Sequence, residues 1–164
     1  MKYTNLNQLL VLKLQSLYDV ETQIIKALPQ MIKKAQSDEL REAFTRHLGE
    51  TEAQKERLEE IFEIVNEKAK KIKVEAIRGI IADAQWLLKQ DIDSEILDAA
   101  LISSARHIEH YEMSGYLSAV HLAELLELED VQALLTDTLE EEEKTDDTLA
   151  DLADTLSQDM PKEM

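Results

Sequence analysis

The helical spacing of the apolar residues constrains the fold most strongly. Apolar side chains recur every three or four positions in four long stretches, a period that fits one face of an α-helix. The stretches span residues 10–32, 40–65, 105–126 and 135–156. Only three glycines and two prolines occur in the 164 residues, so tight turns are scarce and hairpin-rich β folds are disfavoured. The sequence therefore predicts an all-α protein.

Breaks in this spacing predict the connections between the helices. Residues 36–38 (Gln-Ser-Asp) and residues 127–129 (Glu-Leu-Glu) predict two short turns. Residues 66–92 form a longer crossover, which begins with a basic loop and continues with an apolar face that predicts a shorter helix. Two antiparallel helical hairpins joined in this way predict a four-helix bundle, in a single domain over residues 1–164. The crossover leaves open whether the helices on either side of it run parallel or antiparallel.

Two segments are expected to depart from regular helix. Pro29 lies inside the first stretch and predicts a kink near Lys26, or a helix that breaks there and resumes. The last residues, 158–164, follow the final apolar repeat and are expected to form a frayed tail. Neither feature changes the predicted bundle.

Charge and composition narrow the class of protein. The net charge of −17 disfavours nucleic acid as a partner, because a phosphate backbone needs a positive surface. Cysteine is absent, which removes disulfides, thiolate zinc sites and cysteine nucleophiles. No apolar run reaches the roughly 20 residues that span a bilayer, and the N-terminus lacks the apolar segment of a signal peptide. A cytoplasmic protein without membrane contact is therefore expected.

Acidic residues interrupt the apolar seams that should face the core. The acids in phase with these seams are Glu21, Glu112, Glu142 and Asp146. The seam of the second stretch carries further polar residues, namely His47, Thr51 and Gln54, with Glu50 beside it. Burying several ionised carboxylates together costs several kcal/mol each unless cations balance them. The pattern therefore predicts a metal site, and acids whose head groups reach solvent are the alternative.

The spacing of these acids brings them together in pairs. In an antiparallel hairpin, residues at equal distances from the turn lie side by side. Glu21 and Glu50 lie 29 residues apart and are centred on the first predicted turn, whereas Glu112 and Glu142 lie 30 residues apart and are centred on the second. Both hairpins therefore place a carboxylate pair at nearly the same depth. Oxygen and imidazole ligands on facing helices suit iron or manganese.

Four runs resemble the bacterial YciE/YciF-type ferritin-like family. They are residues 17–21 (Leu-Tyr-Asp-Val-Glu), 47–54 (His-Leu-Gly-Glu-Thr-Glu-Ala-Gln), 109–112 (Glu-His-Tyr-Glu) and 139–146 (Leu-Glu-Glu-Glu-Glu-Lys-Thr-Asp). The resemblance covers roughly residues 6–157 and implies a ferritin-like bundle, a homodimer, a di-metal centre and a stress-associated role of undefined chemistry. The Glu109/Glu112 pair is also similar to the third-helix carboxylates of rubrerythrin-like proteins.

The candidate metal ligands are Glu21, His47, Glu50, Glu109, Glu112, Glu142 and Asp146. Two iron ions are expected, with manganese as the alternative metal. Classical ferritin-like di-iron sites carry Glu-x-x-His on two helices. Here Ala53 follows Glu50 by three residues and Thr145 follows Glu142 by three, so neither motif is present. His47 instead precedes Glu50 by three residues, from where it can reach a metal one turn away.

Other polar residues near these ligands have expected places as well. Gln54 is expected to hydrogen-bond a ligand. Tyr18 and Tyr111 are the tyrosines that could hydrogen-bond a ligand carboxylate, although packing is the commoner role for such residues. The histidines without a partner spacing, which are expected at the surface or an interface, are His107, His110 and His121.

Three functions fit this sequence. The first is a metal-dependent oxidoreductase that acts on peroxide or oxygen. The second is a metal-binding or storage protein without turnover, and the third is a structural or interaction bundle with vestigial carboxylates. The first two functions share the same ligands, so the sequence does not separate them.

Overall fold

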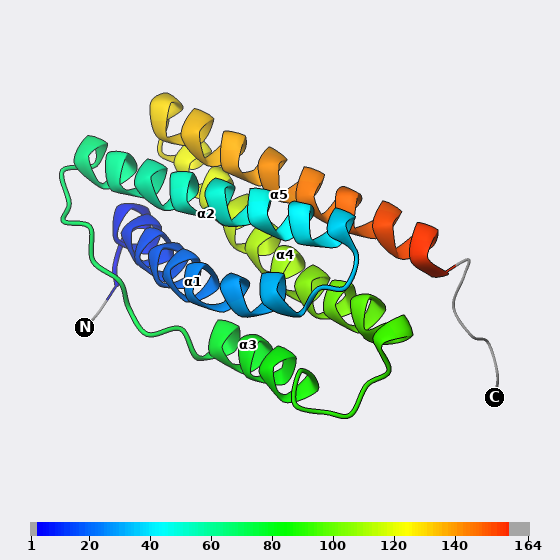
Figure 1. The fold of residues 1–164 in the computed structure, drawn as a ribbon. Coiled ribbons are helices and arrows are strands. Elements are labelled where there is room, and N and C mark those ends of the chain that lie inside the picture. The colour runs from blue at the N-terminus through cyan, green and yellow to red at the C-terminus, as the bar shows by residue number, and fades with distance from the viewer. Residues whose placement is uncertain (1–2, 158–164) are drawn as a thin grey trace.

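The computed structural model describes residues 3–157, with the exception of the Glu95 side chain, and contains five helices over this range (Figure 1). The helices are α1 (Leu6–Lys34), α2 (Asp38–Ile64), α3 (Glu75–Leu87), α4 (Ser94–Leu125) and α5 (Glu129–Ser157). The predicted all-α bundle of two helical hairpins is confirmed, as is the shorter helix in the crossover. The tail predicted at residues 158–164 lies outside the described residues.

The first helix is unbroken from Leu6 to Lys34, although Pro29 lies inside it. The expected break near Lys26 is therefore absent. Proline removes only one backbone N–H from the helical ladder. Its neighbours Leu28 and Met31 are 2% and 3% exposed, so their packing holds the chain in helical conformation across this position.

The direction of α4, which the sequence left open, follows from its contacts with α1. A Cβ atom on Gly115 would lie 3.0 Å from Cδ2 of Leu17, whereas Asp98 bonds the backbone at Gln36. Residue numbers along α4 thus decrease where those along α1 increase, so these two helices are antiparallel. Because α1 and α2 also form an antiparallel hairpin, α4 runs parallel to α2. The crossover carries the chain along the bundle to the end where α1 meets α2, with α3 beside α1 and α4 (Figure 1).

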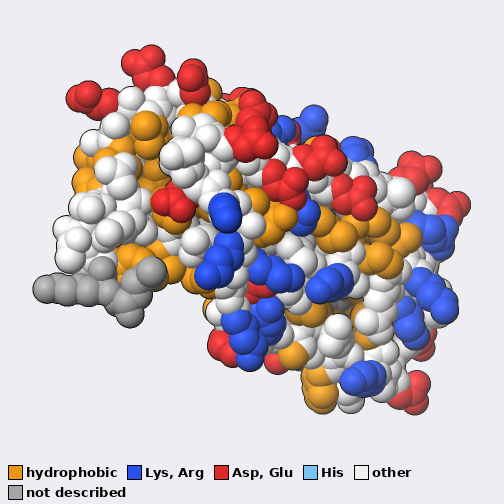
Figure 2. All heavy atoms as spheres, turned by 90° about the vertical axis from the view of Figure 1, so that its left-hand side faces the viewer, with side chains coloured by type: hydrophobic (Ala, Val, Ile, Leu, Met, Phe, Trp, Pro, Cys, Tyr) orange, Lys and Arg blue, Asp and Glu red, His pale blue; other side chains and the backbone are white. Residues whose placement is uncertain are grey.

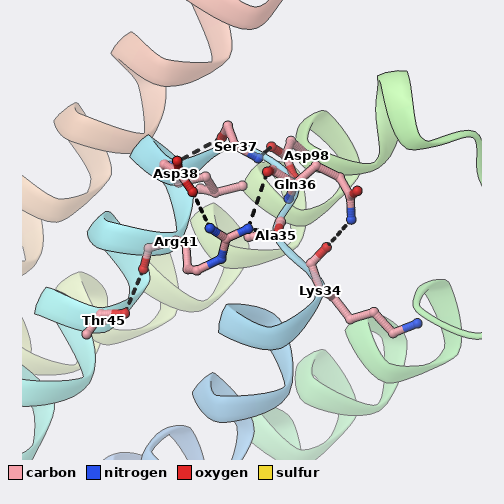
Figure 3. A network of polar contacts seen from close by, with 9 residues as sticks. Lys34, Ala35, Gln36, Ser37, Asp38, Arg41, Thr45 and Asp98 are labelled. Carbon is pink, nitrogen blue, oxygen red and sulfur yellow. Dashed lines mark hydrogen bonds and ion pairs between the residues drawn. The ribbon is translucent and has the colours of Figure 1, made fainter.

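The turn between α1 and α2 is fastened to the start of α4 by one buried carboxylate (Figure 3). Asp98 is 5% exposed and accepts the backbone N–H groups of Gln36 and Ser37 at 2.7 and 2.8 Å. Arg41 donates to the carbonyl oxygens of Ala35 and Gln36 at 3.0 and 3.3 Å. The Ser37 hydroxyl also caps α2 by accepting the N–H of Leu40. The hairpin and α4 are therefore locked in register at this end.

A second buried carboxylate fastens the crossover to α1. Asp19 is 1% exposed, accepts the N–H of Val74 at 2.9 Å and pairs with Arg78. Burial alone would raise the pKa of Asp19, but the hydrogen bonds from Arg78, Val74 and Gln23 together lower it below its ordinary value. The N–H of Ile72 also bonds the carbonyl of Gln15. These contacts fix where the chain leaves the loop and enters α3.

Helices α2 and α4 both end in a left-handed residue. Asn66 has a φ of 53° and Glu127 a φ of 57°. After α4, the N–H of Leu128 bonds the carbonyl of Ala123 and the N–H of Glu127 bonds that of Glu124, which is a Schellman motif. The turn predicted at residues 127–129 is thus formed with glutamate where glycine is usual.

The surface separates positive from negative side chains on one face. Residues 66–74, which connect α2 to α3, carry the exposed Lys68, Lys70, Lys71 and Lys73. Figure 2 shows Lys and Arg side chains gathered across the middle of this face, with Asp and Glu along its upper edge. Within the described residues, no helix is long and apolar enough to cross a membrane.

The hydrophobic core consists of two clusters. One cluster packs Ile24, Leu28 and Phe44 with residues of α3 and α4, and the other packs Leu14 and Leu58 with residues of α4 and α5. Buried polar side chains lie among these core residues on all four long helices: Glu21, His47, Glu109, Glu112 and Glu142. These polar residues contain the candidate site.

Candidate metal centre

Four buried side chains from three helices converge within the bundle. His47 comes from α2, Glu109 and Glu112 from α4, and Glu142 from α5. Each residue offers one ligand atom, and these four atoms lie within 4.8 Å of one another. All four residues are 3% exposed or less. These four residues form the central tetrad. They lie close enough together to surround one metal ion.

Glu21 extends the central tetrad onto the remaining long helix. It lies on α1 and is fully buried. Glu112 and Glu142 lie close enough to shift the pKa of Glu21. All four long helices thus contribute to one polar cluster. The structure therefore brings together five of the seven predicted ligands.

Most ligand atoms of this cluster have no hydrogen-bond partner. Both carboxylate oxygens of Glu112 and of Glu142 are buried and unpartnered, as are both ring nitrogens of His47. Nε2 of His47 lies 3.2 Å from Oε1 of Glu109, but the two atoms do not meet hydrogen-bond geometry. Buried polar atoms normally have partners, and leaving them without any is costly. A cation among them would satisfy these atoms, so the donor set fits a metal.

Burial raises the pKa of every acid in this cluster. It raises the pKa of Glu21 and of Glu109 to about 8. The pKa values of Glu112 and Glu142 are raised well above the ordinary value, first by burial and then by repulsion from neighbouring carboxylates. Without a cation, protons are what neutralise these acids. Metal binding therefore has to displace protons.

A buried tyrosine, rather than either predicted one, hydrogen-bonds a candidate ligand. The Tyr116 hydroxyl donates to Oε1 of Glu21 and is fully buried. Tyr18 instead donates to Glu59 at 2.6 Å, and Tyr111 bonds none of the candidate ligands in the described chain. Tyr116 shares the apolar seam of α4, where a tyrosine is typical of core packing. Its position one turn after Glu112 was the signal that could have identified it.

Gln54, which was expected to hydrogen-bond a ligand, instead bonds Glu141, the residue next to the candidate ligand Glu142. It is 1% exposed, and its amide nitrogen donates to Glu141 at 3.1 Å. The nearby polar side chain of Gln54 also acts to lower the pKa of Glu142, against the larger effect of burial. Glu141 is held in turn by two hydrogen bonds of 2.9 Å from Arg57. This chain of contacts joins α2 to α5 next to the tetrad.

The other two predicted ligands lie outside the central tetrad. The Glu50 side chain is 32% exposed, and its nearest cation is Arg46 at 4.0 Å. Asp146 is 8% exposed and accepts two hydrogen bonds from Arg106, at 2.8 and 3.0 Å. It also lies 3.1 Å from Nε2 of His110. Arg106 lowers the pKa of Asp146, so this carboxylate is already balanced by a positive charge. A ligand role for either acid stays a prediction.

The remaining histidines are exposed, as expected. His107, His110 and His121 all lie at the surface, so His47 is the one buried imidazole among the four histidines of the chain. The cluster therefore combines a single nitrogen-bearing side chain with several carboxylates.

A four-helix bundle with a crossover helix and a buried layer of carboxylates and histidine defines the ferritin-like class of helical proteins. Comparison with known families is more specific. The chain belongs to DUF892, a family described as a domain of unknown function, which matches residues 5–160. Protein YciF of Escherichia coli K12 is 38% identical over 141 residues, which cover 85% of each chain.

Solved structures support the same relationship. The Escherichia coli stress protein YciF has a TM-score of 0.92 at 34% identity, with 96% of this chain and 100% of that chain covered. The YcfI protein of Rhodopseudomonas palustris has a TM-score of 0.87 at 35% identity, with 90% and 94% covered. A Xanthomonas campestris protein, at 17% identity and a TM-score of 0.74, shares the fold over 94% of both chains.

Proposed function

We propose that this protein is a di-metal carboxylate protein that binds iron or manganese in the middle of its bundle. The observation that carries the proposal is the set of buried ligand atoms without partners in the central tetrad. A structural bundle gains nothing from such atoms, because apolar side chains of similar size would pack there at no electrostatic cost. A bound cation would be coordinated by these atoms and would offset the cost of burying them.

Two ions fit the arrangement better than one. The first would lie within the central tetrad, where His47 supplies nitrogen and three glutamates supply oxygen. Glu21, together with the neighbouring carboxylates of Glu112 and Glu142, would hold the second. Mixed imidazole and carboxylate donors suit iron and manganese, and the second position, which has oxygen donors alone, suits manganese especially.

The bound metals would supply one-electron redox chemistry toward peroxide or oxygen. The protein's own part is to hold the ligands on four rigid helices and to exclude bulk water, since the tetrad is 3% exposed or less. The similarity to a stress protein of Escherichia coli supports a stress-related role. Storage without turnover would use the same ligands.

Metal titration of chelator-treated protein tests the proposal. Isothermal titration with Mn(II), and with Fe(II) under anaerobic conditions, should give saturable binding close to two ions per chain. Glu112→Gln should weaken binding at least tenfold, since it removes a shared ligand, whereas Glu127→Gln on the surface should leave binding unchanged. If the wild-type protein binds neither metal at millimolar concentration, the structural or interaction bundle becomes the better explanation.

We also propose a homodimer, formed through the outer face of α4. Between Ile96 and Ala123 this helix has three acids, Asp98, Glu109 and Glu112, and all of them are buried. Its outer face is thus free of carboxylates in a chain with a net charge of −17, and Leu117 on that face is 60% exposed. Sedimentation analysis of Leu117→Glu should show a monomer where the wild type is a dimer, and an unchanged mass would place the interface elsewhere.

A further inference from the structure

Within the cluster, Glu21 has one carboxylate oxygen in a hydrogen bond and the other without a partner. Its Oε1 accepts the hydrogen bond of Tyr116, whereas its Oε2 is buried without a partner. Both oxygens of Glu112 and of Glu142 lack partners. Glu21 is therefore the one acid whose orientation is fixed by a neutral donor.

The donor itself is rigidly placed. Tyr116 is fully buried and belongs to the core cluster that also contains Leu14, Leu58 and Leu135. It lies one helical turn after Glu112 on α4, so the helix that supplies a shared ligand also supplies the hydroxyl that holds Glu21. A phenol buried in an apolar cluster has little freedom to release its acceptor.

We propose that Tyr116 is a positioning residue, which fixes Glu21 as a one-oxygen ligand for the second metal ion. This inference rests on the proposed function. With Oε1 accepting the hydrogen bond of the phenol, the unpartnered Oε2 is the oxygen left free for a cation, so Glu21 is held in one orientation before the metal arrives. Hydrogen-bonding partners that orient ligands in this way typically change metal affinity by about 10- to 100-fold.

A plain packing role for Tyr116 makes a different prediction. In a packing role, Glu21 would only satisfy the hydrogen-bonding need of the buried Tyr116 hydroxyl. Removing the hydroxyl would then change the stability of the fold and leave metal affinity unchanged. If Tyr116 orients Glu21, removing the hydroxyl must weaken metal binding in protein that is still fully folded. The two roles are therefore separable by measuring affinity and melting temperature on the same variant.

Tyr116→Phe is the test, because it removes the hydroxyl and keeps the ring. Mn(II) titration of the wild type at 25 °C should show two binding steps, one of which Glu21→Ala weakens. Tyr116→Phe should weaken that same step at least tenfold and leave the tetrad step unchanged. Tyr111→Phe is the matched control, since Tyr111 directly precedes Glu112 but bonds none of the ligands, and it should bind Mn(II) like the wild type.

A double substitution shows whether the effect passes through Glu21. In the Glu21→Ala background, Tyr116→Phe should produce no further loss of affinity, because the oriented carboxylate is already gone. An affinity of Tyr116→Phe within twofold of wild type overturns the inference, as does an additive loss in the double variant. Absence of Mn(II) binding by the wild type would instead overturn the proposed function, so the two failures are distinguishable.

Discussion

The metal-free protein should become more stable as the pH falls from 8 toward 5, which is the reverse of ordinary acid denaturation. Burial raises the pKa of Glu21 and Glu109 to about 8 in the folded protein, whereas in the unfolded chain each acid titrates near its ordinary value. Between these two pKa values the folded state binds more protons than the unfolded state. Stability must therefore fall as the pH rises through this range.

The size of the effect follows from the two pKa values. Each pH unit within this window changes the free energy of unfolding by about 1.4 kcal/mol for each such acid. From pH 7 to pH 5 the gain is roughly 2–3 kcal/mol each for Glu21 and Glu109, and Glu112 and Glu142 act in the same direction. A total near 5 kcal/mol is a large part of the roughly 5–15 kcal/mol that stabilises a typical domain.

Urea unfolding of chelator-treated protein, followed by circular dichroism at pH 7.5, 6 and 5, measures this gain. The paired acids do not mask it, because Asp19 and Asp146 have lowered pKa values and lose stability only below their ordinary range. A Glu21→Gln/Glu109→Gln variant should lose most of the dependence. A wild-type urea midpoint that stays flat or falls toward pH 5 would refute the claim that these acids are buried together.

Three further predictions concern the metal and the ends of the helices. Mn(II) should raise the melting temperature of the metal-free protein at pH 7.5 and do so much less at pH 5, where protons compete for the ligands; equal shifts in differential scanning calorimetry would contradict this. Asp98→Ala should cost about 2–4 kcal/mol in urea unfolding, because two buried N–H groups lose their acceptor, and Asp98→Asn should cost less. Glu127→Gly should stabilise by about 1 kcal/mol, since glycine adopts the left-handed conformation freely, whereas Glu124→Gly inside α4 should destabilise by a similar amount.

The bundle could be predicted from the sequence because its apolar seams are long and its turns short. Breaks in the apolar spacing predicted the two hairpin turns at residues 36–38 and 127–129, and the structure has turns there. The direction of α4 could not be predicted, since a crossover of this length permits either direction. It depends instead on long-range contacts such as that of Asp98 with the first turn, which no local pattern reveals.

The apolar pattern predicted which part of each helix carries the site, but it did not separate a buried position from the position next to it. Thr51 is fully buried, and neighbouring positions on a helix differ by about 100° around its axis, so Glu50 turns toward the rim. Asp146 does share the buried seam with Glu142, but its charge is met by Arg106 from another helix. Pairings of this kind depend on side chains that meet only after the helices pack.

The buried acids of this protein fall into two groups, those paired with an arginine and those that lie unpaired in the central cluster. Asp19, Asp146 and Glu141 each meet an arginine, and their pKa values are lowered. The glutamates of the cluster meet no arginine or lysine in the described chain, and their pKa values are raised. A chain that pairs its buried acids at the periphery could have done the same in the middle. Because no arginine or lysine of the described chain meets these glutamates, a cation from solution would balance their charge, as the proposed function requires.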